Sequence, residues 1–277
     1  PGVTFEFSSS SGIYVTGDDA ALVAYGESDN RITMTGVQKV PGAWKGILFD
    51  SNNALNELHH VVVEYAGGEE WVSINGAGTV SLDEHARVRI SSSTIRRGDA
   101  YGLRVGHSAK LPDFAENTIT ENNAAVLIPT TAVGALDAAS TYSGNTSDYV
   151  VVDSEQTFED FTVTDIDVPY RMDGMHHVSG GIAAVSAGVT MEFTQDSGIH
   201  VTSDAAALSA TGQIGDEITM TGVEKTSGFW KGVLIDSENP ANLLNRIVIE
   251  YGGSEKWTSM NETAALGIGS TARLTLT

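Results

Sequence analysis

Two lysine–aspartate pairs are the first candidates for chemistry in this sequence. Lys45 precedes Asp50, and the same pair recurs as Lys231 and Asp236. A lysine can act as a general base and a carboxylate can hold a cation, so each pair is a candidate catalytic site. The alternative is structural: the lysine covers a neighbouring tryptophan, and the aspartate ends a strand in a turn. Because the pair occurs twice, we favour the structural interpretation.

Two further tryptophans follow polar, glycine-containing tracts and are candidates for ligand binding. Glu69 precedes Trp71, and Glu255 precedes Trp257 in the same arrangement. An aromatic ring on a loop can stack against a sugar while a nearby carboxylate binds hydroxyl groups. The alternative is that the ring folds back and packs over a sheet. Both interpretations stay open at this stage.

Oxygen-rich turns suggest calcium as the one metal that this chain could bind. Asp50 and Asn52 lie in one such turn, and Asp236 and Glu238 lie in its repeat. Calcium takes carboxylate and amide oxygens as ligands. Asp and Asn are also common in turns simply because their side chains bond to local backbone groups. We expect no other cofactor.

Glutamates and histidines give weaker indications. Hydrolysis of a glycosidic bond needs two convergent carboxylates, and the local candidates are Glu64, Glu69, Glu70 and Asp83. Only Glu64 and Glu69 recur in the second copy, as Glu250 and Glu255. The place of Glu64 in an alternating strand predicts a solvated outer position. The doublets His59-His60 and His176-His177 are expected to point to opposite faces of a strand, so neither doublet should close on one metal.

These residues belong to a long internal duplication. The segment from Trp44 to Ser51 recurs from Trp230 to Ser237, an offset of 186 residues that holds without insertion from Gly2/Gly188 to Ser91/Thr277. About half of the aligned positions are identical, which is the mark of a repeat architecture. Trp44 and Trp230 each precede a strand and are predicted to be buried at a corner of the fold.

The secondary structure that must position these residues is predicted to be entirely β. Short β-prone runs recur at intervals of about 8 to 12 residues, separated by glycine and Asx turns. A finer step of 24 residues relates Thr94-Ile95 to Thr118-Ile119. Units of this length cannot bury their apolar faces alone but can do so by stacking. The sequence therefore predicts a parallel β-helix, a three-sided solenoid of coils of about 24 residues whose lengths vary.

The duplication also predicts the domain organisation. The first unit occupies residues 1–187 and the homologous second unit occupies residues 188–277. Residues 153–180 are acidic and rich in turns, so we expect a connector there, with a strand at residues 161–164. The second unit matches only the first half of the first, so we expect the chain to be part of a longer protein.

Five motifs together carry a resemblance to a known class of proteins: Pro1–Phe7, Ile32–Gly36, Trp44–Ile47, Val62–Tyr65 and Val168–Arg171. The sequence is similar to right-handed parallel β-helix repeat proteins that bacteria and archaea secrete or display, the pectate-lyase-like superfold. This superfold also includes polysaccharide lyases, whose lysine or arginine base and calcium-binding carboxylates would correspond to Lys45 and Asp50. The resemblance implies the fold, but not one activity, because glycosidases and adhesins share it.

Composition restricts the partners. The 277 residues carry 15 Lys+Arg against 36 Asp+Glu, a formal charge of -21, which disfavours nucleic acid and anionic membranes. There is no cysteine, so disulfides and zinc–thiolate sites are excluded. No apolar run is long enough to insert into a membrane.

From these observations we expect a non-catalytic, extracellular or cell-surface module. It would serve as a rigid structural or adhesive element, and its partners would be further copies of itself, neighbouring repeats or a polysaccharide. The alternatives are a polysaccharide-active enzyme, lyase before hydrolase, and a module that binds glycans without cleaving them.

Overall fold

The computed structural model describes residues 1–74 and 76–277. The chain is all-β, with its strands stacked as parallel neighbours in several sheets and one short 3-10 helix, η1 (Thr130–Ala135). It divides into two compact units. The first comprises residues 1–150 and 166–168, and the second comprises residues 151–165 and 169–277.

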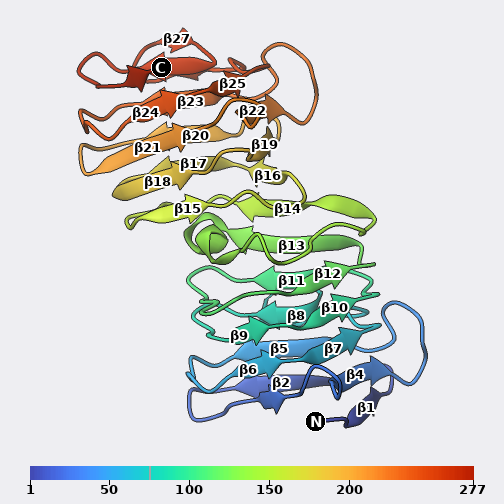
Figure 1. The fold of residues 1–277 in the computed structure, drawn as a ribbon. Helices are drawn as coiled ribbons and strands as arrows, with labels where there is room; N and C mark the ends of the chain where they lie inside the picture. Colours follow the sequence, from blue (N-terminus) through green and yellow to red (C-terminus); the bar gives the residue numbers. More distant parts are fainter. Residues whose placement is uncertain (75) are drawn as a thin grey trace. The chain divides into compact units, whose positions relative to one another are not determined.

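Three sheets of parallel strands make up the first unit, drawn from blue to green in Figure 1. One contains β1, β4, β7, β10 and β12 in that order, another contains β2, β5, β8, β11 and β13, and the third contains β3, β6 and β9. The strands are β1 (Thr4–Phe7), β2 (Gly12–Thr16), β3 (Val23–Tyr25), β4 (Ile32–Gly36), β5 (Gly46–Asp50), β6 (Glu57–His59), β7 (Val61–Glu64), β8 (Gly78–Leu82), β9 (Arg89–Ser91), β10 (Thr94–Arg96), β11 (Tyr101–Val105), β12 (Thr118–Thr120) and β13 (Ala124–Pro129). β14 (Ser147–Asp153) includes the division between the units.

The second unit repeats this pattern. Its parallel sheets contain β16, β19, β22 and β25, then β17, β20, β23 and β28, then β15, β18, β21, β24 and β29, and β26 pairs with β27 as an antiparallel hairpin. The strands are β15 (Phe161–Val163), β16 (Tyr170–Asp173), β17 (Met175–Val178), β18 (Gly181–Val185), β19 (Thr190–Phe193), β20 (Gly198–Val201), β21 (Ala206–Thr211), β22 (Ile218–Gly222), β23 (Gly232–Ile235), β24 (Leu243–Asn245), β25 (Ile247–Ile249), β26 (Lys256–Trp257), β27 (Glu262–Thr263), β28 (Leu266–Ile268) and β29 (Thr275–Leu276).

Residues 153–180, predicted as a connector, contain three of these strands. The strand expected near residue 161 is β15, which pairs with β18, while β16 pairs with β19 and β17 with β20. These three strands belong to the second unit, whereas residues 166–168 of the same segment belong to the first. The boundary between residues 187 and 188 describes the sequence repeat and stays a prediction.

Alternation of apolar and polar residues explains why the strands stack. In β4, Ile32 and Met34 are buried while Thr33 between them is partly exposed, and the second copy has the same sequence and pattern in β22. Met34 lies beside Val63 of the next strand, so like residues repeat along the inside of the sheet. The predicted step of 24 residues is found between β10 and β12, where Thr94 pairs with Thr118. Other steps are longer, as in β2 and β5, where Ile13 faces Ile47.

The chain turns between sheets through single residues with left-handed backbone. His60 separates β6 from β7 with φ of 50°, and Arg246 separates β24 from β25 with the same φ. This conformation is unfavourable for residues other than glycine, so the strands on both sides must hold it in place. The expectation that His59 and His60 point to opposite faces is wrong for this reason: their rings are in contact, with centroids 4.3 Å apart.

Buried asparagines brace other turns of the first unit. Asn122 accepts a hydrogen bond from the backbone N–H of Gly98 (2.9 Å), and its amide donates to the carbonyl of Ile95 (3.1 Å). Its amide also donates to the side chain of Asn145 (3.2 Å), which continues the row to the next turn. Polar side chains here satisfy backbone groups that the strands cannot reach.

The tryptophans predicted to be buried at corners are confirmed. Trp44 stacks on Phe7 and donates from its indole nitrogen to the carbonyl of Glu64 (2.9 Å). Trp230 stacks on Phe193 and donates to the carbonyl of Glu250 (2.7 Å). Each large ring thus closes one corner of its copy and leaves no indole N–H unsatisfied.

Candidate functional site

The two copies place equivalent side chains in two clusters, which we name by their lysine and tryptophan. The first Lys–Trp cluster lies on β2, β5 and the loop before β8. The second lies on β20, β23 and the β26–β27 hairpin. The first consists of Tyr14, Lys45, Asp50, Glu69 and Trp71, and the second of His200, Lys231, Asp236, Glu255 and Trp257.

In the first cluster the lysine pairs with the loop rather than with the aspartate. The Nζ atom of Lys45 lies 3.1 Å from Oε2 of Glu69 and 5.6 Å from the centre of the Trp71 ring. Hydrogen bonds from Ser10 and from Lys45 lower the pKa of Glu69. The lysine therefore links the loop to the sheet through one ion pair and one cation–π contact, and the ion pair is weak because Glu69 is exposed to solvent.

Asp50 has a different partner. Lys45 directly precedes β5 and Asp50 is the last residue of β5, so five residues of extended chain, roughly 16 Å, separate the two. Tyr14 donates a hydrogen bond from its hydroxyl to Oδ2 of Asp50 (2.8 Å), and this bond raises the pKa of Tyr14. Thr16 donates to the same oxygen (3.3 Å). The structure thus does not bring the predicted base and carboxylate together.

The second cluster has the same geometry. Lys231 lies 3.3 Å from Glu255 and 5.2 Å from the centre of the Trp257 ring. Asp236 again has another partner: Nε2 of His200 lies 3.0 Å from its Oδ2. The ring of His200 also contacts Trp257, with centroids 5.9 Å apart.

His200 is a residue that sequence reasoning missed. It occupies the position of Tyr14 in the first copy, and each of the two side chains reaches an aspartate two residues beyond the residue with which it pairs on the next strand. The repeat aligns Tyr14 with His200 and Asp50 with Asp236, but it does not show that these side chains are in contact. His177 lies beside His200 on the neighbouring strand, and burial followed by the charges of His200 and Lys231 lowers its pKa.

The loop tryptophans pack against the sheets in both copies. Trp257 is buried and donates from its indole nitrogen to the carbonyl of Ala264 (3.3 Å). Trp71 lies over Gly12 so closely that a Cβ there would be 2.8 Å from the ring, which explains the glycine. The Trp71 ring also contacts Tyr14, with centroids 5.9 Å apart. Binding of a glycan to Trp71, Glu69, Trp257 and Glu255 stays a prediction.

Each predicted calcium turn donates a backbone N–H to an aspartate outside the predicted set of ligands. Asp18 accepts a bond from the N–H of Asn52 (2.8 Å), and Asp204 accepts one from the N–H of Glu238 (2.7 Å). Among the described residues, no group of three or more His, Cys, Asp or Glu side chains is placed to hold a metal ion. Calcium at Asp50, Asn52, Asp236 and Glu238 stays a prediction.

Glu64 is not the solvated residue that its strand pattern predicted. It is buried, and Arg96 donates to its Oε2 from Nε (2.9 Å) and Nη2 (2.8 Å). Thr35 donates to its other oxygen (3.2 Å). The carboxylate is therefore an internal brace between β4, β7 and β10. Sequence could not show this, because Arg96 lies one strand further along the sheet.

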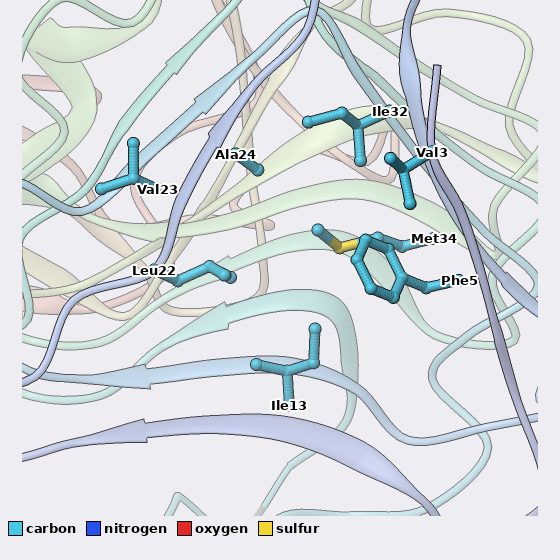
Figure 2. A pocket seen from close by; sticks show the side chains of 8 residues that line it. All are labelled: Val3, Phe5, Ile13, Leu22, Val23, Ala24, Ile32 and Met34. Atoms are coloured by element: carbon cyan, nitrogen blue, oxygen red, sulfur yellow. The ribbon is translucent and has the colours of Figure 1, made fainter. Parts of the chain in front are cut away.

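An apolar hollow of about 270 Å³ lies among β1, β2, β3 and β4. Figure 2 shows Phe5 and Met34 side by side in it, with Ile32 and Val3 above them. No charged side chain lines it, so it offers apolar contact and no groups for catalysis. It is lined by Val3, Phe5, Ile13, Leu22, Val23, Ala24, Ile32 and Met34.

None of the described helices is long and apolar enough to cross a membrane. Comparison of the chain with family models, curated proteins and solved structures finds no match.

Proposed function

We propose that the stacked parallel strands form a right-handed, three-sided β-helix that serves as a non-catalytic, rigid element of a surface or secreted protein. The observation that carries this proposal is the identical corner in both copies. The Phe7–Trp44 stack has its counterpart in Phe193–Trp230, with centroids 4.2 and 4.0 Å apart and planes within 8° and 9°. Packing is thus what the two copies have in common.

The ionisable residues support the same proposal because many differ between the copies. The lysines are retained, but each binds a loop glutamate, and the group bound to the aspartate changes from a phenol in Tyr14 to an imidazole in His200. A phenol and an imidazole have ordinary pKa values of about 10 and 6.5, so they are not interchangeable in proton transfer. They are interchangeable as hydrogen-bonding groups that fix an aspartate at a strand end.

The experiment that tests the proposal is incubation with a panel of uronate and neutral polysaccharides, with and without calcium. We expect neither unsaturated nor reducing ends to accumulate. Unsaturated ends that form with the wild-type protein and are lost in Lys45→Ala or Lys231→Ala would establish a polysaccharide lyase, and either these or reducing ends alone would overturn the proposal. Glu70→Ala, at an exposed position outside the Lys–Trp clusters, serves as the control.

A module that binds glycans without cleaving them is the second candidate, because Lys45, Glu69 and the partly exposed ring of Trp71 lie together in the first cluster. It predicts that Trp71→Ala weakens retention on a glycan array. The variant must keep the wild-type unfolding temperature, since Trp71 also packs on the sheet. Titration with calcium during the same measurement tests the predicted calcium turns, where binding would raise the unfolding temperature.

A further inference from the structure

Two asparagines of this chain stand first in the pattern Asn-X-Ser/Thr, where X is any residue other than proline. The pattern occurs at residues 145–147, as Asn-Thr-Ser, and at residues 261–263, as Asn-Glu-Thr. It is the acceptor sequence for N-linked glycosylation, in which a sugar is joined to the asparagine side chain of a secreted or surface protein. The structure distinguishes the two sites, because the transferase must reach the asparagine amide and the hydroxyl group of the third residue together.

The side chain of Asn145 is used inside the fold. Its amide nitrogen donates hydrogen bonds to the carbonyls of Ile119 (3.0 Å) and Tyr142 (2.6 Å). Its oxygen accepts a hydrogen bond from the backbone N–H of Asn122 (3.0 Å), so Asn145 continues the row of asparagines that braces the turns. Both N–H groups of the amide are thus engaged in the folded chain, and attachment of a sugar there would break the row.

Asn261 lies instead on the β26–β27 hairpin (β27 in Figure 1), and Asn261, Glu262 and Thr263 are all exposed. The backbone N–H of Asn261 donates to the carbonyl of Trp257 (2.7 Å), so the turn is closed through the backbone while the side chain lies at the surface. The hairpin pairs Lys256 with Thr263 and Trp257 with Glu262. So short a two-stranded ladder opens at small cost, which makes the pattern accessible to an enzyme.

Comparison of the two copies separates what the turn needs from what the acceptor pattern needs. Asn261 has a left-handed backbone with φ of 55°, which asparagine adopts more readily than most residues. The first copy also has an asparagine at the aligned position, Asn75, but Thr263 is aligned with Ala77. The turn therefore explains the asparagine and leaves the threonine unexplained. The hydroxyl group of Thr263 completes an acceptor pattern in the second copy alone.

We propose that Asn261 is a site of N-linked glycosylation and that Asn145 is not. The amide nitrogen of Asn261 forms a bond to C1 of an oligosaccharide that is carried on a lipid pyrophosphate. The bond between C1 and the pyrophosphate oxygen breaks, the lipid pyrophosphate leaves with the electron pair, and an amide proton passes to a base of the transferase. The inference rests on the proposed function, since a surface or secreted protein is the kind that meets such a transferase.

The sugar would be attached beside the second Lys–Trp cluster, because Trp257 of that cluster lies in the same hairpin. The first Lys–Trp cluster has no acceptor pattern in its loop. Glycosylation would therefore make the two clusters different at their surfaces, with the first left free of attached sugar.

Glycosylation of the purified, folded chain tests the geometry. The full chain is produced in cells without N-glycosylation and is incubated with a lipid-linked oligosaccharide and an oligosaccharyltransferase that accepts synthetic peptides of both patterns. Mass spectrometry should find the added oligosaccharide on Asn261 and an unmodified Asn145. Thr263→Ala should abolish the modification and Thr263→Ser should keep it. Thr258→Ala, in the same hairpin but outside the pattern, is the control and should be modified like wild type.

Two results of this experiment would overturn the proposal. One is an Asn261 that stays unmodified in the folded chain, and the other is an Asn145 that is modified as readily as Asn261. Because Asn261 is exposed, the glycosylated chain should also keep the unfolding temperature of the unmodified chain. A clearly lower unfolding temperature would contradict the surface position of the site.

Protein purified from its natural source tests whether the modification is made there. Mass spectrometry should find an oligosaccharide on the peptide that contains Asn261. An unmodified Asn261 in this protein would overturn the proposal even if the folded chain accepts the sugar in vitro. The polysaccharide assay uses the unmodified chain and is unaffected by either result, so failure of this inference is distinguishable from failure of the proposed function.

Discussion

The indole of Trp44 lies flat against the phenyl ring of Phe7, with centroids 4.2 Å apart and planes inclined by 8°. The stack joins β1 to the segment before β5, and the indole nitrogen bonds to the end of β7. One side chain thus connects three passes of the chain. The same relationship between Trp230 and Phe193 indicates that the corner is a structural requirement of each copy.

Replacement of this tryptophan should therefore be costly. We expect Trp44→Ala and Trp230→Ala each to lower the free energy of unfolding by about 3–5 kcal/mol, because a fully buried ring is replaced by a cavity. Chemical denaturation measures the change. Val72→Ala, at an exposed position, should have almost no effect, and a loss below about 1 kcal/mol for Trp44→Ala would contradict the assigned role.

Replacement of the buried asparagine Asn122 should also lower the stability of the protein. Asn122→Ala removes the acceptor of the Gly98 N–H and the donor to the Ile95 carbonyl. Leaving such buried groups unsatisfied costs about 1–3 kcal/mol each. The neighbouring Asn123 is exposed, so Asn123→Ala is a matched control in the same denaturation experiment. Equal stability of the two variants would show that water replaces the amide.

Glu64 predicts a charge-dependent contribution to stability. Glu64→Gln keeps the shape of the side chain but removes the ion pair with Arg96, and we expect a loss of about 1–3 kcal/mol. Because the ion pair is partly buried, most of this loss of stability should persist in high salt. The control Glu70→Gln, at an exposed position, should change the stability little. If the difference in stability between wild type and Glu64→Gln disappeared in high salt, the carboxylate of Glu64 would be exposed to solvent and the assigned role would be wrong.

The stability of the folded protein should depend on pH through the buried side chain of His176. Burial lowers its pKa to about 3, with a smaller contribution from the charge of His177. Because the folded state favours the neutral ring, this contribution to stability is complete above the ordinary pKa of about 6.5 and decreases as pH falls from 6.5 towards 3. Over this window wild type should lose several kcal/mol more than His176→Gln. The exposed His85 gives the control, His85→Asn. Parallel stability curves for wild type and His176→Gln would contradict the assignment.

The sequence predicted the packing well and the polar contacts poorly, for a physical reason. Alternation and duplication report directly on which residues face inward, as Met34 and Trp44 do. Partners across a sheet lie about 24 to 36 residues apart, so pairs such as Tyr14 with Asp50 and Glu64 with Arg96 leave no local pattern. Closeness in sequence suggests that Lys45 and Asp50 form a pair, yet the strand β5 separates them.

The most direct test of the central claim, that both copies form one and the same packed scaffold, is hydrogen exchange resolved along the chain. We expect the amides of β4 and β5 to exchange as slowly as those of β22 and β23, and at least about a thousandfold more slowly than exposed loop amides. Fast exchange in either copy, or protection in only one of them, would contradict the claim.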